Sequence, residues 1–190
     1  INQMLLNICT GKNSSTELSK VALVLTYKSN IVIVADFDGD ESLRSQIINV
    51  LVRWAKLHLK NCKLFSFMDD KKRICIVINS DPVYKNITLD KINYYKNSFS
   101  KHFNITLYAG VGNFYESIDK LNTSYSEAKK SLEYCYIKGN DAAVFFPDIN
   151  KHIFTFLNLP VHSGNPLLNS VKIGDYNTCL KLLKEYFENV

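Results

Sequence analysis

The sequence predicts an α+β fold, in which one ferredoxin-like antiparallel sheet is covered by helices. Two observations predict it. Apolar segments follow one another as strand, helix, hairpin, helix, strand, helix, strand, which is a βαββαβ core with one further αβ unit. The chain has 190 residues, 46% hydrophobic and 22% charged, with only 7 Gly and 4 Pro. That composition excludes collagen-like, low-complexity and disordered proteins, and it allows a real hydrophobic core.

Residues 1–28 are expected to form a helical lead-in. Met4, Leu5 and Ile8 recur at helical spacing and are followed by Gly11, which stops a short helix. The run of Ser and Thr at 14–16 then offers an N-cap for a second short helix. A first strand follows at residues 31–35, whose β-branched side chains are apolar on both faces. That pattern is typical of a central strand that is covered on both sides.

A long helix and a hairpin come next. After a polar turn at residues 38–40, apolar residues recur at helical spacing as far as about Leu59: Leu43, Ile47, Leu51, Trp54 and Ala55. Two apolar runs at 64–67 and 74–78 are joined by the short charged tip 69–73, which predicts a β-hairpin.

The remaining elements complete the core. A helix ending near His102 is marked by Leu89, Ile92, Tyr95 (or Tyr94) and Phe99. Residues 105–111 read as a strand closed by Gly110 and Gly112. Asn122 or Thr123 then caps a helix that Gly139 stops, and one face of it carries Tyr125, Ala128, Leu132 and Cys135. A short strand at 142–146 ends before Pro147.

The C-terminal part has a different pattern. Helical spacing is lost across Pro160, Gly164 and Pro166, and a start at Gly174 and Asp175 leads into a clean amphipathic helix. Its apolar face holds Tyr176, Leu180, Leu183 and Phe187. We therefore expect three parts: a lead-in (1–28), a core domain (29–147), and a C-terminal extension with a linker helix (148–190).

Charge and cysteine usage indicate a cytoplasmic protein. The net charge of +5 neither requires nor excludes an acidic partner. The odd, scattered cysteines form no CxxC pair or Cys/His cluster, so neither a disulfide framework nor a zinc site is indicated: Cys9, Cys62, Cys75, Cys135 and Cys179. No apolar run approaches the length that spans a membrane. The first residue is Ile rather than Met, which predicts a piece of a longer protein.

The most suggestive polar cluster is the acidic run of Asp36, Asp38 and Asp40 after the first strand. Clustered carboxylates suit a divalent cation. An EF-hand loop from Asp36 fails, because Glu41 and Ile47 stand where Gly and Glu are needed. The favoured interpretation is a solvated turn that caps the next helix.

The other candidate motifs are weaker. Gly110 and Gly112 lack the third glycine of a dinucleotide-binding loop, since Tyr115 stands there, so they are expected to end a strand and turn the chain. The tip 69–73 reads as an ordinary polar hairpin turn. The histidines have no metal-ligand spacing: His58, His102, His152 and His162. We therefore assign no catalytic residue, no metal ligand and no cofactor, and a cofactor-binding residue stays unknown.

Two segments resemble a known family. Residues 107–112 (LYAGVG) and residues 124–134 (SYSEAKKSLEY) resemble the central domain of bacterial AraC-type response regulators. These transcription factors hold a degenerate GGDEF-like domain between a sensory part and a C-terminal helix-turn-helix pair. The approach to the last helix, residues 167–175, also fits. The resemblance implies a nucleotide-cyclase-like fold, in agreement with the order of elements.

The resemblance also bears on activity. Diguanylate cyclases place a metal-binding Asp at the end of the first strand, and Asp36 stands at the matching place. Their G-G-D/E-E-F hairpin is replaced here by Phe67 to Arg73, without glycines and with Lys71 and Lys72. The R-x-x-D inhibitory motif is missing upstream. We therefore expect no enzyme activity.

The function expected from the sequence is a non-catalytic, signal-coupling domain of an AraC-type DNA-binding response regulator of a two-component system. Its partners would be its own upstream receiver or sensory domain, a downstream helix-turn-helix domain and, through the terminal helix, a second copy of the chain. DNA would be bound only through the domain beyond Val190. Two alternatives stay open: a nucleotide-binding or residual diguanylate-cyclase-type enzyme that uses Asp36 and the 69–70 tip, and a small-molecule sensor.

Overall fold

A computed structural model describes residues 1–38, 46–50, 53, 57, 61–81, 85–138, 143–149 and 166–188. The chain divides into two compact units, Ile1–Asp148 and Ile149–Val190, which are described separately. The predicted division at residues 28 and 147 into three parts stays a prediction. Among the described residues, no helix is both long and apolar enough to cross a membrane.

The first unit is built on a five-stranded sheet in the order β2-β3-β1-β4-β5. Its strands are β1 (Ser29–Asp38), β2 (Cys62–Met68), β3 (Ile74–Ser80), β4 (Thr106–Val111) and β5 (Val144–Phe145). Neighbours pair antiparallel except for β4 and β5, which are parallel. The sheet with its packed helices confirms the predicted α+β fold.

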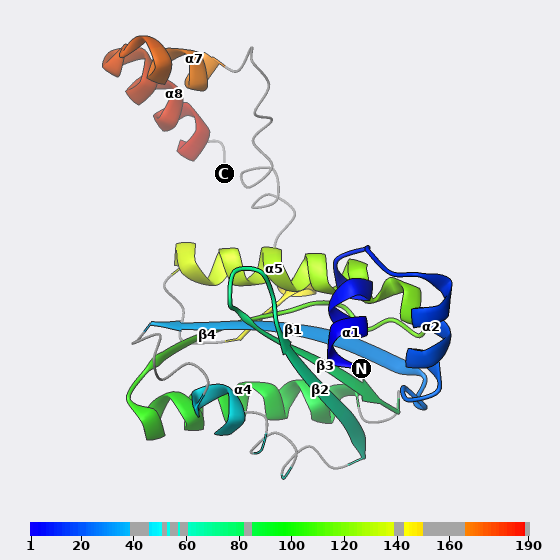
Figure 1. Ribbon diagram of the computed structural model, residues 1–190. Helices are drawn as coiled ribbons and strands as arrows, with labels where there is room; N and C mark the ends of the chain where they lie inside the picture. Colours follow the sequence, from blue (N-terminus) through cyan, green and yellow to red (C-terminus); the bar gives the residue numbers. More distant parts are fainter. Residues whose placement is uncertain are drawn as a thin grey trace. The chain divides into compact units, whose positions relative to one another are not determined.

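Helices cover both faces of this sheet (Figure 1). One face carries α1 (Asn2–Cys9), α2 (Ser15–Ala22) and α5 (Leu121–Lys138), and the other carries α4 (Lys85–Phe103). Among the described residues of this unit, short 3-10 helices are found at η3 (Ile118–Lys120) and η4 (Phe146–Asp148).

The central strand β1 separates two hydrophobic clusters. Val32 and Val34 pack with Leu5, Tyr125 and Leu132 on the α1 and α5 side. The alternate residues Ile31, Ile33, Ala35 and Phe37 pack with Ile92 and Phe99 of α4 on the other side. Successive side chains of a strand point to opposite faces of the sheet. A central strand that contributes to a hydrophobic cluster on each face therefore needs a continuous apolar run.

Several local predictions are confirmed. Ser14 caps α2: its hydroxyl oxygen accepts a hydrogen bond from the Glu17 amide, and the Glu17 carboxylate accepts one from the Ser14 amide. The hairpin β2–β3 forms with Phe67 opposite Cys75. The predicted inner face of α5 is buried at every position: Tyr125, Ala128, Leu132 and Cys135.

Other boundaries differ from the prediction. β1 continues to Asp38, so Asp36 and Asp38 lie in the strand and not in a turn. Helix α5 begins at Leu121, before the predicted caps Asn122 and Thr123, because η3 leads directly into it. β5 holds only Val144 and Phe145, since the chain turns into η4 at Phe146.

Gly110 and Gly112 have a different role from the predicted one, which was to end the strand and turn the chain. Gly110 lies inside β4, paired with Val34, and the strand continues past it. A Cβ on Gly110 would overlap the Ala128 carbonyl oxygen and the Leu132 amide nitrogen of α5, and one on Gly112 would overlap the Ser124 carbonyl oxygen. The two glycines therefore let the backbone of α5 rest against β4.

The described part of the second unit, residues 149 and 166–188, includes the helices α7 (Pro166–Ile173) and α8 (Tyr176–Glu188). Helix α8 begins as predicted, after Gly174 in a left-handed conformation (φ 73°) and with the Asp175 carboxylate accepting the Thr178 amide at 3.1 Å. Helix α7 was not expected, because Pro166 reads as a break; here it is the first helical residue, where its missing N–H costs nothing.

Some predictions fall on parts of the chain that the structure leaves undescribed. Of the predicted helix 43–59, residues 46–50, 53 and 57 are described and helical, with Ile47 buried. The other positions named for it lie outside the described residues, as do Gly39, Asp40, Gly139, Pro160 and Gly164.

Candidate functional site

The tip of the β2–β3 hairpin is closed by one buried carboxylate. Asp69 Oδ1 accepts the backbone amides of Lys71 at 3.0 Å and Arg73 at 2.9 Å. Asp69 Oδ2 accepts Arg73 Nε at 2.7 Å and pairs with Arg73 Nη2 at 2.6 Å. Lys72 supplies the left-handed residue of the turn (φ 59°). An Asp side chain that accepts a hydrogen bond from the backbone amide two residues later stabilises a tight turn, and other tight turns use glycines at such positions.

This ion pair is buried, since the Asp69 side chain is 0% exposed and that of Arg73 is 9% exposed. Burial by itself raises the pKa of the Asp69 carboxyl, but the side-chain and backbone hydrogen bonds from Arg73 outweigh it, and the net pKa is lowered. For Arg73 burial lowers the pKa, but the hydrogen bonds that Arg73 donates to Asp69 and the negative charge of Asp69 outweigh burial and raise the pKa. Both groups are therefore charged at neutral pH.

Helix α5 is attached to this pair through Tyr125. The Tyr125 hydroxyl donates to Asp69 Oδ2 at 3.1 Å, across 56 positions of sequence. Burial first, and then the nearby Cys75 and Asp69, raise the pKa of Tyr125, so the hydroxyl keeps its proton and remains a donor.

A second tyrosine of α5 reaches the end of β1. The Tyr136 hydroxyl donates to Asp36 Oδ2 at 2.9 Å, and the Tyr108 hydroxyl of β4 donates to Asp38 Oδ2 at 3.1 Å. The rings of Tyr108 and Tyr136 meet edge to face, with centroids 5.1 Å apart. Burial and then the Asp36 hydrogen bond raise the pKa of Tyr136.

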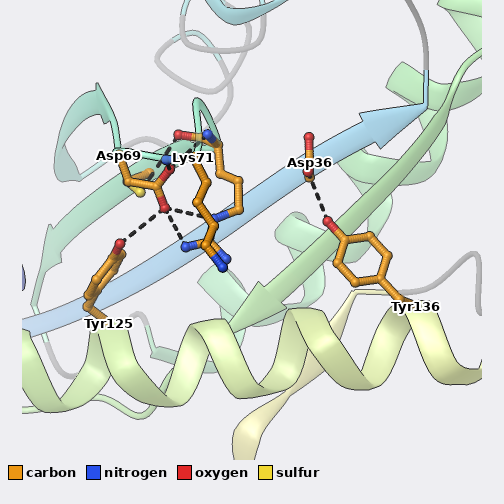
Figure 2. A network of polar contacts seen from close by, with 7 residues as sticks. Asp36, Asp69, Lys71, Tyr125 and Tyr136 are labelled. Carbon is orange, nitrogen blue, oxygen red and sulfur yellow. Dashed lines mark hydrogen bonds and ion pairs between the residues drawn. The ribbon is translucent and has the colours of Figure 1, made fainter.

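Both tyrosine–carboxylate pairs lie on the same side of the sheet, between the strands and α5 (Figure 2). The positive charge of Arg73 acts on both Tyr125 and Tyr136, where it lowers the pKa against the larger raising effect of burial. The arrangement is therefore one polar site, in which α5 connects the hairpin tip to the end of the central strand.

The donor set is poorly matched to a divalent cation. Asp36 and Asp38 each accept a tyrosine hydroxyl. Within the described part of the chain, no group of three or more His, Cys, Asp or Glu side chains lies close enough to hold a metal ion. Hard cations take several oxygen ligands, and the described residues supply two carboxylates at this place, each of which already accepts a tyrosine hydroxyl.

The segment 124–128 has a structural role at the β4–α5 contact. The Ser124 hydroxyl accepts the Val32 amide at 3.0 Å and donates to the Asn113 carbonyl at 2.8 Å. Glu127 accepts the Asn113 amide at 2.8 Å and the Tyr115 hydroxyl at 2.7 Å. Burial and then the Glu127 bond raise the pKa of Tyr115 to about 12. These polar side chains fix how α5 enters its position over the sheet.

The remaining candidates from the sequence lie apart from this site. His102 is exposed on α4, with its ring centroid 4.9 Å from that of Phe103. His58, His152 and His162 lie outside the described residues. All five cysteines are free thiols. Burial raises the pKa of Cys9 to about 12 and raises the pKa values of Cys75 and Cys135 as well.

Comparison with known proteins identifies the family. Residues 26–134, more than half of the chain, match the family described as the GGDEF-like domain. The chain belongs to this family. A solved structure that it resembles is the GGDEF domain of DgcB from Caulobacter crescentus in complex with c-di-GMP, with 11% identity, coverage of 76% of this chain and 85% of that chain, and a TM-score of 0.47. No curated protein matches it.

Membership of the GGDEF-like family confirms the domain type expected from the resemblance, and it corrects one expectation. We predicted that the chain is not an enzyme, because its hairpin lacks the glycines of the G-G-D/E-E-F motif. The family match overturns that prediction, because this domain type is the one that diguanylate cyclases carry. A diguanylate-cyclase-type or cyclic-di-GMP-binding domain is thus the class of function that the GGDEF-like family indicates.

Sequence reasoning missed the two tyrosines that define the site. Tyr125 was assigned to the core, and Tyr136 was not singled out. Tyr136 lies 100 positions from Asp36, so nothing local in the sequence pairs them. The available signal was the helical spacing of α5, which places Tyr125 on its inner face with Ala128 and Leu132.

Proposed function

We propose that this GGDEF-like domain is a cytosolic signal-coupling domain of a bacterial AraC-type transcription regulator. Such a domain would stand between an upstream sensory or receiver domain and a downstream helix-turn-helix pair. Its task would be to bias an equilibrium between arrangements of these neighbours. The assignment to AraC-type regulators is supported by the resemblance of residues 107–112, 124–134 and 167–175.

The observation that carries the coupling role is the double attachment of α5. Tyr125 bonds Asp69 at the hairpin tip, and Tyr136 bonds Asp36 at the end of β1. A change in the hairpin or in β1 therefore alters a hydrogen bond to the same helix. One helix that is connected to two separate parts of a sheet is a suitable element for relaying a structural change.

The test uses the complete natural protein, with a promoter reporter and binding to its operator DNA. Tyr125→Phe removes only the hydroxyl that reaches Asp69, and we expect it to change the response to the input by about fivefold or more while DNA affinity without input stays close to normal. Tyr27→Phe is the matched control, because the Tyr27 hydroxyl forms no hydrogen bond with the described residues. The proposal fails if the complete protein contains no helix-turn-helix pair, or if both variants respond alike.

The expected partners follow from the same proposal. The upstream and downstream domains would be neighbours in one chain, and a homodimer would form through α8. Light scattering over a hundredfold range of concentration tests the dimer. A monomer at every concentration, for both this chain and the complete protein, would remove that part of the proposal.

A second candidate is binding or turnover of guanine nucleotides, and family membership favours it. Asp36 and Asp38 stand side by side on β1, each held by a tyrosine hydroxyl. Calorimetry with GTP and with cyclic di-GMP, each with and without Mg²⁺, tests binding, and chromatography of a GTP incubation tests turnover. Affinity near micromolar that is lost in Asp36→Ala would support this candidate. Affinity unchanged in Asp36→Ala would place any nucleotide elsewhere.

A further inference from the structure

A pocket of about 400 Å³ lies beside the hairpin tip, on the side of α1. The end of α1, the tip residue Asp70 and the first turns of α5 form its walls. The side chains that carry the argument are Lys12, Asp70, Asn122, Tyr125, Ser126 and Lys129. Tyr125 is shared between this pocket and the site above, because its hydroxyl bonds Asp69.

Two positive charges line this pocket. Among the residues that the structure describes, neither Lys12 nor Lys129 pairs with a carboxylate. Lys129 Nζ is 4.5 Å from the centroid of the Tyr125 ring, which holds the ammonium group at the pocket wall through a cation–π contact. Asp70 is the one carboxylate in the lining, so the two lysines leave an excess of positive charge.

The neutral groups of the lining add hydrogen-bond donors. The Asn122 side-chain oxygen already accepts the Thr123 hydroxyl at 3.2 Å, which leaves the Asn122 amide hydrogens for a ligand. The Ser126 hydroxyl is exposed one position after Tyr125. Burial raises the pKa of the Cys9 thiol to about 12, so Cys9 adds no negative charge. Two ammonium groups, an amide and a hydroxyl form a donor set that matches phosphate oxygens.

We propose that this pocket binds a small molecule that bears a phosphate group, with Lys12 and Lys129 pairing with the phosphate. Asp70 would accept a hydrogen bond from a hydroxyl or amine elsewhere on the same molecule. A sugar phosphate and a nucleotide share this chemistry. The inference concerns binding alone and does not depend on the proposed function.

The experiment measures binding to the whole 190-residue chain by calorimetry and by thermal shift, at constant ionic strength. The probes are inorganic phosphate, glucose 6-phosphate and GMP, with chloride as the anion that lacks phosphate geometry. The variants are Lys12→Gln and Lys129→Gln. Lys101→Gln, an exposed lysine of α4 on the opposite face of the sheet, is the control for an equal loss of charge.

We expect saturable binding of at least one phosphate probe and a loss of about tenfold in affinity in each pocket variant, with Lys101→Gln unchanged. A preference for glucose 6-phosphate would identify a sugar phosphate as the ligand class, and a preference for GMP would identify a nucleotide. Absence of saturable binding to all three probes would overturn the proposal. An equal loss of affinity in all three variants would also overturn the proposal, since it would show that only the net charge of the protein affects binding. Circular dichroism checks that each variant is folded.

Discussion

The two ends of α5 use the same hydrogen bond in different surroundings. At the hairpin end Tyr125, 3% exposed, donates to a carboxylate that is fully buried and paired with Arg73. At the other end Tyr136, 45% exposed, donates to Asp36, which is partly open to solvent. A buried bond whose partners cannot reach water is costly to break, whereas water can replace an exposed one. The hairpin end therefore anchors α5, and the β1 end can open.

The most severe test of this difference removes the charge that compensates Asp69. Arg73→Met leaves a fully buried carboxylate without its cation, and we expect it to lower the free energy of unfolding by about 3–5 kcal/mol. Urea denaturation followed by circular dichroism measures the loss. The double variant Asp69→Asn with Arg73→Met removes both charges and should recover part of the stability. A loss below about 1 kcal/mol in the single variant would show that the ion pair is not buried in solution.

The next test concerns the close packing of α5 on β4, which holds both ends of the helix in place. Gly110→Ala places a methyl group against the Ala128 carbonyl and the Leu132 amide, and backbone atoms can yield only if α5 moves. We expect a loss of roughly 3 kcal/mol in unfolding free energy.

Gly11→Ala serves as the contrasting substitution for Gly110→Ala. Gly11 has a left-handed backbone (φ 72°) and nothing within 4 Å of the added Cβ, so only backbone strain opposes the change. A loss of about 1 kcal/mol is expected there. Equal losses in the two variants would contradict the close approach of α5 to β4.

A smaller effect is expected when the hydroxyls of Tyr125 and Tyr136 are removed one at a time and compared. Tyr125→Phe removes a buried donor to a charged acceptor, and we expect a loss of about 1–2 kcal/mol in unfolding free energy. Tyr136→Phe removes a donor at a wetter position, and we expect a loss within about 0.5 kcal/mol. Identical values for the two variants would refute the distinction between an anchored and an openable end.

The mildest perturbation is acid. The folded pKa of Asp69 is below its unfolded value, so the folded state binds fewer protons there. The stability that this group contributes is fully present above its unfolded pKa, near about pH 4, and is lost as pH falls through the lower folded value. Urea denaturation from pH 7 to pH 2 should show this acid limb. The Asp69→Asn, Arg73→Met variant should lack that part of it.

The fold could be predicted from the sequence wherever one segment carries its own signal. The apolar run 31–35 predicts a central strand, and Ser14 with Glu17 predicts the start of α2, because strand burial and helix capping depend on neighbours in the chain. Helix α7 was hidden for the opposite reason. A proline breaks a helix when it lies inside it, but it is also a favourable first residue of a helix. The sequence around Pro166 does not distinguish the two cases.

The site could be predicted only in part. Asp36 was singled out, and the hairpin tip was recognised, because both lie next to clear strand signals. The bonds from Tyr125 and Tyr136 depend on how α5 crosses the sheet, and that crossing is set by Gly110 and Gly112. A sequence shows that a glycine is present, but it does not show which distant backbone uses the space. Pairings across 56 and 100 positions therefore became visible only in three dimensions.

The two glycines beneath α5 have a mechanical consequence. Where a helix packs through layers of side chains, those side chains can change rotamer and absorb a displacement. At Gly110 in β4, and at Gly112 just after it, the backbone of α5 lies directly against the backbone of the chain with no side chain between them. Tyr125 and Tyr136 are eleven residues apart, a rise of about 16 Å along the axis. We therefore expect α5 to move as one rigid segment between these two points, so that a displacement at the hairpin end also displaces Tyr136.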